Sequence, residues 1–208
     1  MSISLTIDLN DRDLEHFQSA MVSARKAAEG KSNEEIIGCS GKLLEDAQKV
    51  HIPDFIKERL LQLDDMIAMV RDEGWALPEA DRSRVLAALV YFCDPKDVIP
   101  DQVEVLGFLD DAIMIELCVR ELKHELDAYD DFCDFRQREA EKRGCNPAEV
   151  RHADWLTSRR DELLDRMHQR RERDQADGFG SGYGASSGYG TKRSYVRSWR
   201  PGNLFKMG

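Results

Sequence analysis

The sequence predicts an all-α protein, a bundle of about six helices. Apolar residues recur three and four positions apart along most of the chain, as they do on one face of a helix. The chain shows no succession of strands with the pattern of a parallel sheet. Charged residues make up 34% of the chain, above the roughly 25% of an average globular domain, and this fits helices that expose one polar face.

Most of the predicted helices begin at a recognisable start signal. Either a side chain that caps the first turn or a proline marks each start: Asn10, Ser32 with Glu35 three positions on, Pro53, Pro78 and Pro147. The fifth helix, over about 109–142, is expected to be long and unbroken. Its first half is very apolar, which predicts a buried central element. The last helix is expected over about 147–173.

Composition divides the chain into three parts. Residues 1–9 alternate apolar and polar side chains, and we expect a short extended arm there. Residues 10–176 form the helical domain. Residues 177–208 are rich in Gly, Ser and Tyr. We expect this tail to be disordered because ordering it costs ~1–2 kcal/mol per residue with little apolar burial in return, and within it Leu204 and Phe205 are a candidate docking element.

Charge separates the same parts. The net charge is −10, but residues 178–208 hold five basic and no acidic side chains, so the rest of the chain, with 25 basic and 40 acidic residues, has a net charge of −15. An acidic body excludes a generic nucleic-acid binder. The tail is different, because aromatic rings beside cations are typical of single-strand nucleic-acid or partner contacts: Tyr183, Tyr189, Lys192, Arg193, Tyr195, Arg197, Trp199 and Arg200.

The cysteines and the apolar runs indicate the compartment. The five cysteines are scattered and form no C-x-x-C pair, so we expect reduced thiols rather than disulfides or a zinc site. No secretory signal pattern is present. No apolar run reaches the ~20 residues that cross a bilayer, since acidic residues interrupt the best candidate, 103–119. The sequence therefore predicts a cytoplasmic protein without a membrane span.

The segment 91–111, YFCDPKDVIPDQVEVLGFLDD, has the most unusual composition in the chain. Its pattern is D-P-x-D-x-I-P-D, five residues, then G-x-x-D-D. Over roughly residues 80–125 the chain resembles the bacterial YkvA family, the domain of unknown function DUF1232. The resemblance implies a fold but no chemistry. Family members are often more hydrophobic around this motif, which suggests membrane association for them, and this chain departs from that pattern. We expect no membrane span here, and peripheral membrane association is the alternative that stays open.

We consider three interpretations of the motif residues, which are Asp94, Asp97, Pro100, Asp101, Gly107, Asp110 and Asp111. The favoured one is a structural corner between helices, in which the carboxylates accept hydrogen bonds from nearby backbone N–H groups and offset the helix dipole. The second is a Mg²⁺ or Ca²⁺ site, because hard cations take oxygen ligands; its candidates are Asp97, Asp101, Asp110 and Asp111. The third is a partner-docking surface. No cofactor is predicted outright.

No catalytic motif is recognisable: the chain has no phosphate loop, no G-x-S-x-G and no H-E-x-x-H. We therefore predict a non-enzymatic adaptor or regulatory module that binds another protein. The aromatic stripe of Tyr129, Phe132 and Phe135 is expected to be exposed for such contacts. The alternatives are a divalent-cation-dependent hydrolase that uses the aspartates, and single-strand nucleic-acid binding through the tail.

Overall fold

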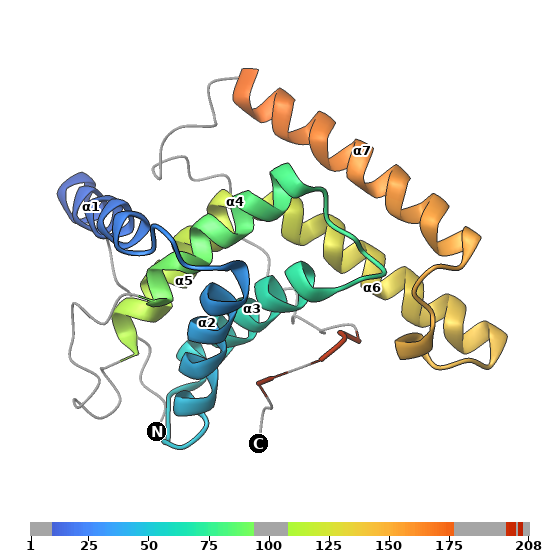
Figure 1. Ribbon diagram of the computed structural model, residues 1–208, viewed down its shortest axis with the longest axis horizontal. Coiled ribbons are helices and arrows are strands. Elements are labelled where there is room, and N and C mark those ends of the chain that lie inside the picture. The colour runs from blue at the N-terminus through green and yellow to red at the C-terminus, as the bar shows by residue number, and fades with distance from the viewer. Residues whose placement is uncertain (1–9, 94–107, 177–198, 203, 206–208) are drawn as a thin grey trace.

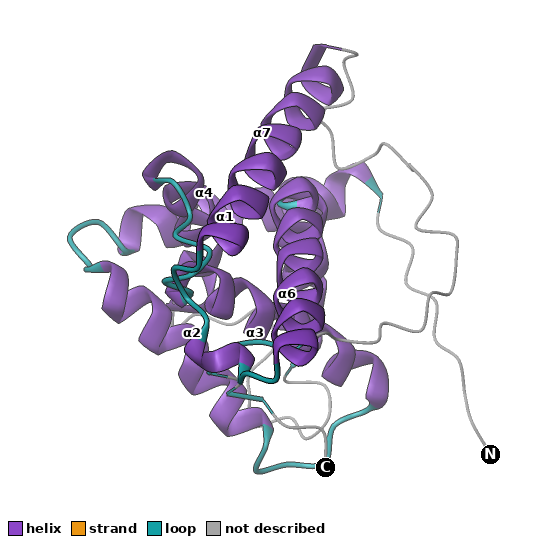
Figure 2. Cartoon of the chain, turned by 90° about the vertical axis from the view of Figure 1, so that its right-hand side faces the viewer, coloured by secondary structure: helices purple, strands orange, loops and turns teal. Residues whose placement is uncertain are grey.

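The computed structural model describes residues 10–93, 108–176, 199–202, 204 and 205 (Figure 1). Within these ranges the secondary structure consists of seven α-helices and two short 3₁₀ helices, with no strand (Figure 2). The predicted all-α class is therefore confirmed. The predicted arm at 1–9 and most of the tail from 177 lie outside the described residues.

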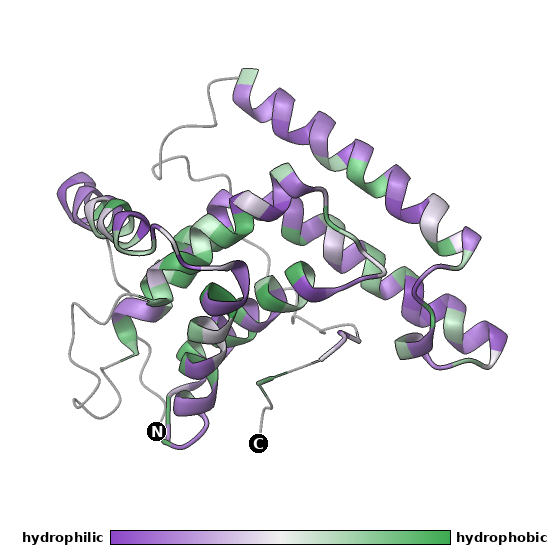
Figure 3. Cartoon of the chain, viewed as in Figure 1, coloured by the Kyte–Doolittle hydropathy of each residue, from purple (hydrophilic) through white to green (hydrophobic). Residues whose placement is uncertain are grey.

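Most of the helices follow one another with short connections, whereas residues 94–107, between η1 and α5, lie outside the described ranges. Their bounds are α1 (Asp11–Ala27), α2 (Asn33–Ala47), α3 (Asp54–Arg71), α4 (Glu79–Leu89), η1 (Val90–Cys93), α5 (Leu109–Glu121), α6 (Lys123–Arg143), η2 (Pro147–Glu149) and α7 (Asp154–Ala176). The central element is α3, which is buried along most of its length and packs against α2, α4, α5 and α6. The outermost is α7, which packs mainly on α6 and is hydrophilic over most of its surface (Figure 3).

The predicted start signals of the first two helices are confirmed. The Asn10 side chain accepts hydrogen bonds from the backbone of Arg12 and Asp13, and the Asp13 carboxylate accepts the backbone N–H of Asn10, which completes a capping box. Ser32 and Glu35 form the same reciprocal arrangement at the start of α2. These caps depend on residues three positions apart, so local sequence is enough to predict them.

The predicted long fifth helix is wrong in one respect, because it is broken at Leu122. There the backbone (φ −99°, ψ 19°) leaves the helical region, and α5 and α6 point in different directions (Figure 1). Leu122 itself is fully buried. The physical reason is packing: α5 lies along α3, whereas α6 contacts both α3 and α7. One straight helix from 109 to 142 would not place both apolar faces against these neighbours.

The last helix also begins later than predicted. Pro147 starts only the short η2, whose first turn Asn146 caps through the backbone of Ala148. The backbone then becomes extended at Val150 (φ −92°, ψ 98°), and α7 begins at Asp154. Its first residues place Trp155 against Phe135 of α6, at 5.9 Å between ring centroids. This contact, and not the proline, marks the start of α7.

Candidate functional site

The structure describes two of the five motif aspartates. Asp110 and Asp111 occupy the first turn of α5 and are 2% and 6% exposed. Their position at a helix start agrees with the structural-corner interpretation, since a carboxylate there offsets the positive end of the helix dipole. The other motif residues lie outside the described residues: Asp94, Asp97, Pro100, Asp101 and Gly107.

The described part of the chain holds no cluster of three His, Cys, Asp or Glu side chains that could bind a metal ion. A cation site built on the motif therefore stays a prediction, because three of its five aspartates lie outside the described ranges.

A buried ion pair connects the end of α3 to the middle of α6. The carboxylate of Asp72 accepts two hydrogen bonds from Arg136, at 3.0 Å from Nη1 and 2.5 Å from Nη2. It also accepts from the Tyr129 hydroxyl at 3.1 Å and from the backbone N–H groups of Gly74 and Trp75 at 2.9 and 3.3 Å. With five donors around it, the buried charge of Asp72 is well compensated.

The surroundings of this pair shift the pKa values of Tyr129 and Arg136. Burial raises the pKa of the Tyr129 hydroxyl well above its ordinary value, and the nearby Cys133 and Asp72 raise it further. For Arg136, burial alone would lower the pKa, but the hydrogen bonds and charge of Asp72 more than offset this and raise it. Arg136 therefore stays charged, and the Tyr129 hydroxyl stays a neutral donor, at physiological pH.

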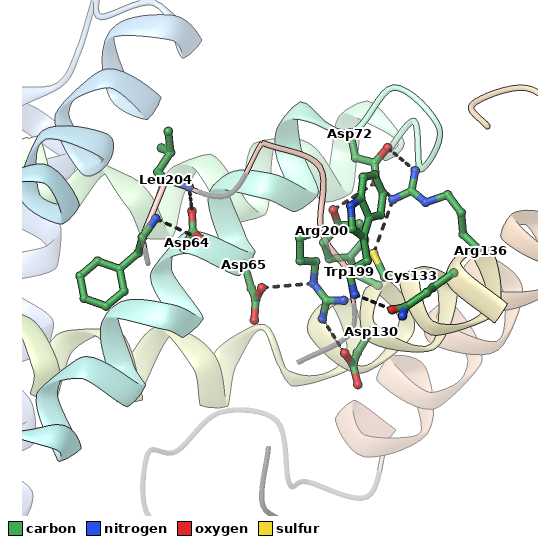
Figure 4. Close-up of polar contacts among 12 residues, drawn as sticks. Asp64, Asp65, Asp72, Asp130, Cys133, Arg136, Trp199, Arg200 and Leu204 are labelled. Carbon is green, nitrogen blue, oxygen red and sulfur yellow. Dashed lines mark hydrogen bonds and ion pairs between the residues drawn. The ribbon is translucent and has the colours of Figure 1, made fainter. Parts of the chain in front are cut away.

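The same region receives the end of the chain (Figure 4). The ring of Trp199 lies over the guanidinium of Arg136, 4.8 Å from its central carbon to the ring centroid, and its backbone N–H donates to Gln137 Oε1 at 2.9 Å. Arg136 also lies 4.9 Å from the centroid of the Phe132 ring. Its guanidinium thus contacts aromatic rings and a carboxylate at the same time, an arrangement that suits the planar, delocalised cation of arginine.

Arg200 is a deeply buried cation. It is 3% exposed, and its Nε donates to Asp65 at 3.1 Å while its Nη2 donates to Asp130 at 2.5 Å (Figure 4). Asp65 belongs to α3 and Asp130 to α6. One side chain therefore joins two helices by charge-assisted hydrogen bonds.

The chain then crosses α3 towards α2. Asp64 of α3 accepts the backbone N–H groups of Leu204 at 3.1 Å and Phe205 at 3.5 Å. Gln48, which follows α2, donates to the Leu204 carbonyl at 3.0 Å, and Phe205 is 4% exposed within the core. We name residues 199–202, 204 and 205 the C-terminal segment. Five residues of the helical body contact Trp199, Arg200 or the backbone N–H groups of this segment, and we call them the docking face: Asp64, Asp65, Asp130, Arg136 and Gln137.

Two predictions from the sequence, the exposed aromatic stripe and the disordered tail, are corrected by the positions of these side chains. The aromatic stripe is not exposed: Tyr129 and Phe132 are fully buried and Phe135 is partly buried, because α6 lies against α3, Trp75 and α7. In the tail, Trp199 and Arg200 lie against the helical body, so the expected disorder does not extend to them. The other tail candidates lie outside the described residues: Tyr183, Tyr189, Lys192, Arg193, Tyr195 and Arg197.

A signal for the docking face was present in the sequence. Asp64 lies four residues after Leu60 and three before Ile67, on the apolar stripe of α3. Arg136 likewise lies four residues after Phe132. A charged residue on a buried stripe requires hydrogen-bond donors or acceptors, or an opposite charge. These positions therefore predict polar partners, although not which residues supply them.

A second group of buried charges joins α4, α6 and α7. Arg171 Nη1 donates to Asp81 at 2.7 Å and to Glu125 at 2.9 Å; His168 Nε2 lies 2.7 Å from Asp81, and Arg84 Nε donates to Glu125 at 3.0 Å. Asp81 and Glu125 are 1% and 0% exposed. Since α7 packs mainly on α6, these bonds are what hold it to α4 as well.

Comparison with known proteins supports the family resemblance. The family described as "Protein of unknown function (DUF1232)" matches residues 82–117, which include most of α4, η1 and the first part of α5. The chain is 34% identical over 80 residues to "Uncharacterized membrane protein YkvA" of Bacillus subtilis (strain 168), an alignment that covers 36% of this chain and 74% of YkvA. No solved structure matches the chain. None of the described helices combines the length and the apolar composition that a bilayer span requires. From the motif, the family match and the similarity over most of YkvA, the chain belongs to the DUF1232 family.

Proposed function

We propose that this protein is a non-enzymatic adaptor or regulatory module that acts by binding a basic segment of a partner protein at the docking face. The observation that carries the proposal is Arg200, held between Asp65 and Asp130 of two different helices. This geometry already recognises one arginine-bearing peptide, the C-terminal segment of the chain itself. The docking face lies outside residues 82–117, so the recognition is proposed for this chain and not for the family.

The chemistry of the docking face supports peptide recognition. Two carboxylates from different helices match the planar fork of an arginine, which lysine does not present. Asp64 accepts two consecutive backbone N–H groups, so it recognises an extended main chain whatever its side chains. The acidic body, with a net charge of −15 outside residues 178–208, favours the approach of basic segments.

Affinity capture with matched variants tests the proposal. The side chain of Asp130 is 43% exposed, so Asp130→Lys removes one of the two carboxylates that bind Arg200 without burying a new charge. Asp131→Lys makes the same charge change at an exposed neighbour on α6. We expect partners bound by the wild-type chain and by Asp131→Lys to be lost with Asp130→Lys, and their cross-links to map to arginine-bearing segments. Partners that bind all three chains equally would contradict the proposal.

We also propose that the protein acts in the cytoplasm. The similar protein YkvA carries "membrane protein" in its name, whereas none of the described helices of this chain is suited to span a bilayer. Fractionation of cells that express the tagged full chain tests the location. Recovery in the soluble fraction supports it, and recovery in membranes that resist a salt wash contradicts it.

A further inference from the structure

Resting on that proposed function, we infer that the C-terminal segment is an internal competitor, which occupies the docking face and must be displaced before a partner binds. The partner segment is expected to contain an aromatic residue followed by arginine, in an extended chain that ends in apolar side chains. Every contact of the C-terminal segment described above is one that such a partner would have to reproduce.

The carboxylates of the docking face favour a cationic ligand. Asp64 and Asp65 are 1% and 2% exposed while the C-terminal segment is in place. Without the segment, Arg200 would no longer offset the charges of Asp65 and Asp130, whose carboxylates both contact its guanidinium. Like charges repel at such separations, so an empty docking face attracts a basic ligand strongly.

Three contacts define the chemistry of that ligand. The guanidinium of Arg136 takes an aromatic ring on its face, as it does with Trp199. Asp65 and Asp130 together take an arginine, as they do with Arg200. Asp64 takes two backbone N–H groups, which excludes proline at those two positions.

The covalent connection makes the C-terminal segment a strong competitor. Residues 177–198, 22 in number, join it to the end of α7. A ligand tethered through a linker that spans the distance acts at an effective concentration on the order of millimolar. A partner at micromolar concentration therefore binds weakly until the C-terminal segment is released. In the resting protein the C-terminal segment occupies the docking face.

A labelled peptide of residues 194–208 serves as the probe for the test. Its binding to full chains is measured by fluorescence anisotropy. Arg200→Glu in the protein releases its own segment, and Arg173→Glu, an exposed position on α7, makes the same charge change elsewhere. We expect Arg200→Glu to bind the probe at least ~10-fold more tightly than the wild-type chain or Arg173→Glu, because internal competition is removed. Adding Asp130→Asn to Arg200→Glu, which removes the carboxylate without creating a cation for the introduced glutamate, should weaken binding strongly, and so should Arg200→Glu within the probe.

A second form of the protein, which keeps Arg200, is the control for misfolding of Arg200→Glu. A protease site inserted between residues 181 and 188 leaves every described contact unchanged, and cleavage followed by dialysis should raise probe binding to the same extent. Equal binding by intact, cleaved and Arg200→Glu chains would overturn the competitor role while leaving the docking face as a recognition site. Absence of binding by the cleaved and the Arg200→Glu chains would overturn both. A dimeric wild-type chain in light scattering would contradict an intramolecular contact.

Discussion

The indole ring of Trp199 lies over the guanidinium of Arg136, and the same guanidinium forms two hydrogen bonds to Asp72. The end of the chain therefore contacts the ion pair that joins α3 to α6. Aromatic contact and ion pairing use different parts of an arginine, its face and its edge, so both are satisfied together. The contact of the C-terminal segment and the buried ion pair of the helical core therefore share this one side chain.

Removal of Arg136 should destabilise the protein strongly. Arg136→Ala leaves the carboxylate of Asp72 buried without its cation, and breaking a buried pair in this way costs about 3–5 kcal/mol of unfolding free energy. Arg138→Ala is the control, because its pair with Asp134 is exposed and should change stability by less than about 0.5 kcal/mol. Urea titration followed by circular dichroism measures both. Similar midpoints for the two variants would show that the buried pair contributes little.

Gly74→Ala should also weaken the Asp72–Arg136 pair. A Cβ atom at position 74 would lie 3.0 Å from Nη1 of Arg136 and 3.2 Å from the backbone oxygen of Arg151, so neighbours must move. We expect a loss of about 1–3 kcal/mol in unfolding free energy. Gly38→Ala in α2 has open space around it and should stabilise by about 0.5–1 kcal/mol. Changes of the same sign in thermal melts of the two variants would contradict this account.

The attachment of α7 should weaken in acid. Burial would raise the pKa of Asp81, but hydrogen bonds from His168 and Arg171, and their charges, lower it on balance. A lowered folded-state pKa adds stability that is complete above the unfolded-state value, about 4, and is lost as the pH falls through the folded-state value. Unfolding free energy should therefore fall less steeply below pH 4 for Asp81→Asn than for the wild type or Asp131→Asn. Parallel pH profiles would exclude this role for Asp81.

The five free cysteines should differ in reactivity. Burial raises the pKa of the Cys118 thiol to about 12 and that of Cys133 to about 11, whereas Cys39 and Cys145 are partly exposed. Because only the thiolate reacts, iodoacetamide at pH 8 should modify Cys39 and Cys145 well before Cys118 and Cys133 in the folded protein. Mass spectrometry over time measures the order, and denatured protein is the control. Uniform rates in the folded state would contradict the burial seen here.

Release of the C-terminal segment should be visible in tryptophan fluorescence. Arg200→Glu places an anion beside Asp65 and Asp130, so repulsion should move Trp199 into water. We expect a red-shifted emission and greater quenching by acrylamide, while Arg173→Glu keeps the wild-type spectrum. Trp199→Phe removes the reporter, and in that background Arg200→Glu should cause no further shift. A shift that persists there would point to the other tryptophans.

Local sequence determined the parts of this protein that depend on neighbours three or four residues apart. The capping boxes at Asn10 and Ser32, the stripe of α3 and the start of α5 at Leu109 all follow from such spacing. The break at Leu122 and the late start of α7 do not follow from such spacing, because they depend on how helices that are distant in sequence pack together.

The functional residues divide in the same way. The sequence alone determined that Asp64 and Arg136 lie on apolar helical stripes, where an unpaired charge is costly. Only the tertiary structure decided which partners the buried charged residues have, since Arg200 meets Asp65 across 135 positions of the chain. Pairing over such a distance depends on the relative placement of α3, α6 and the C-terminal segment. That placement results from the packing of the whole core, and no local spacing encodes it.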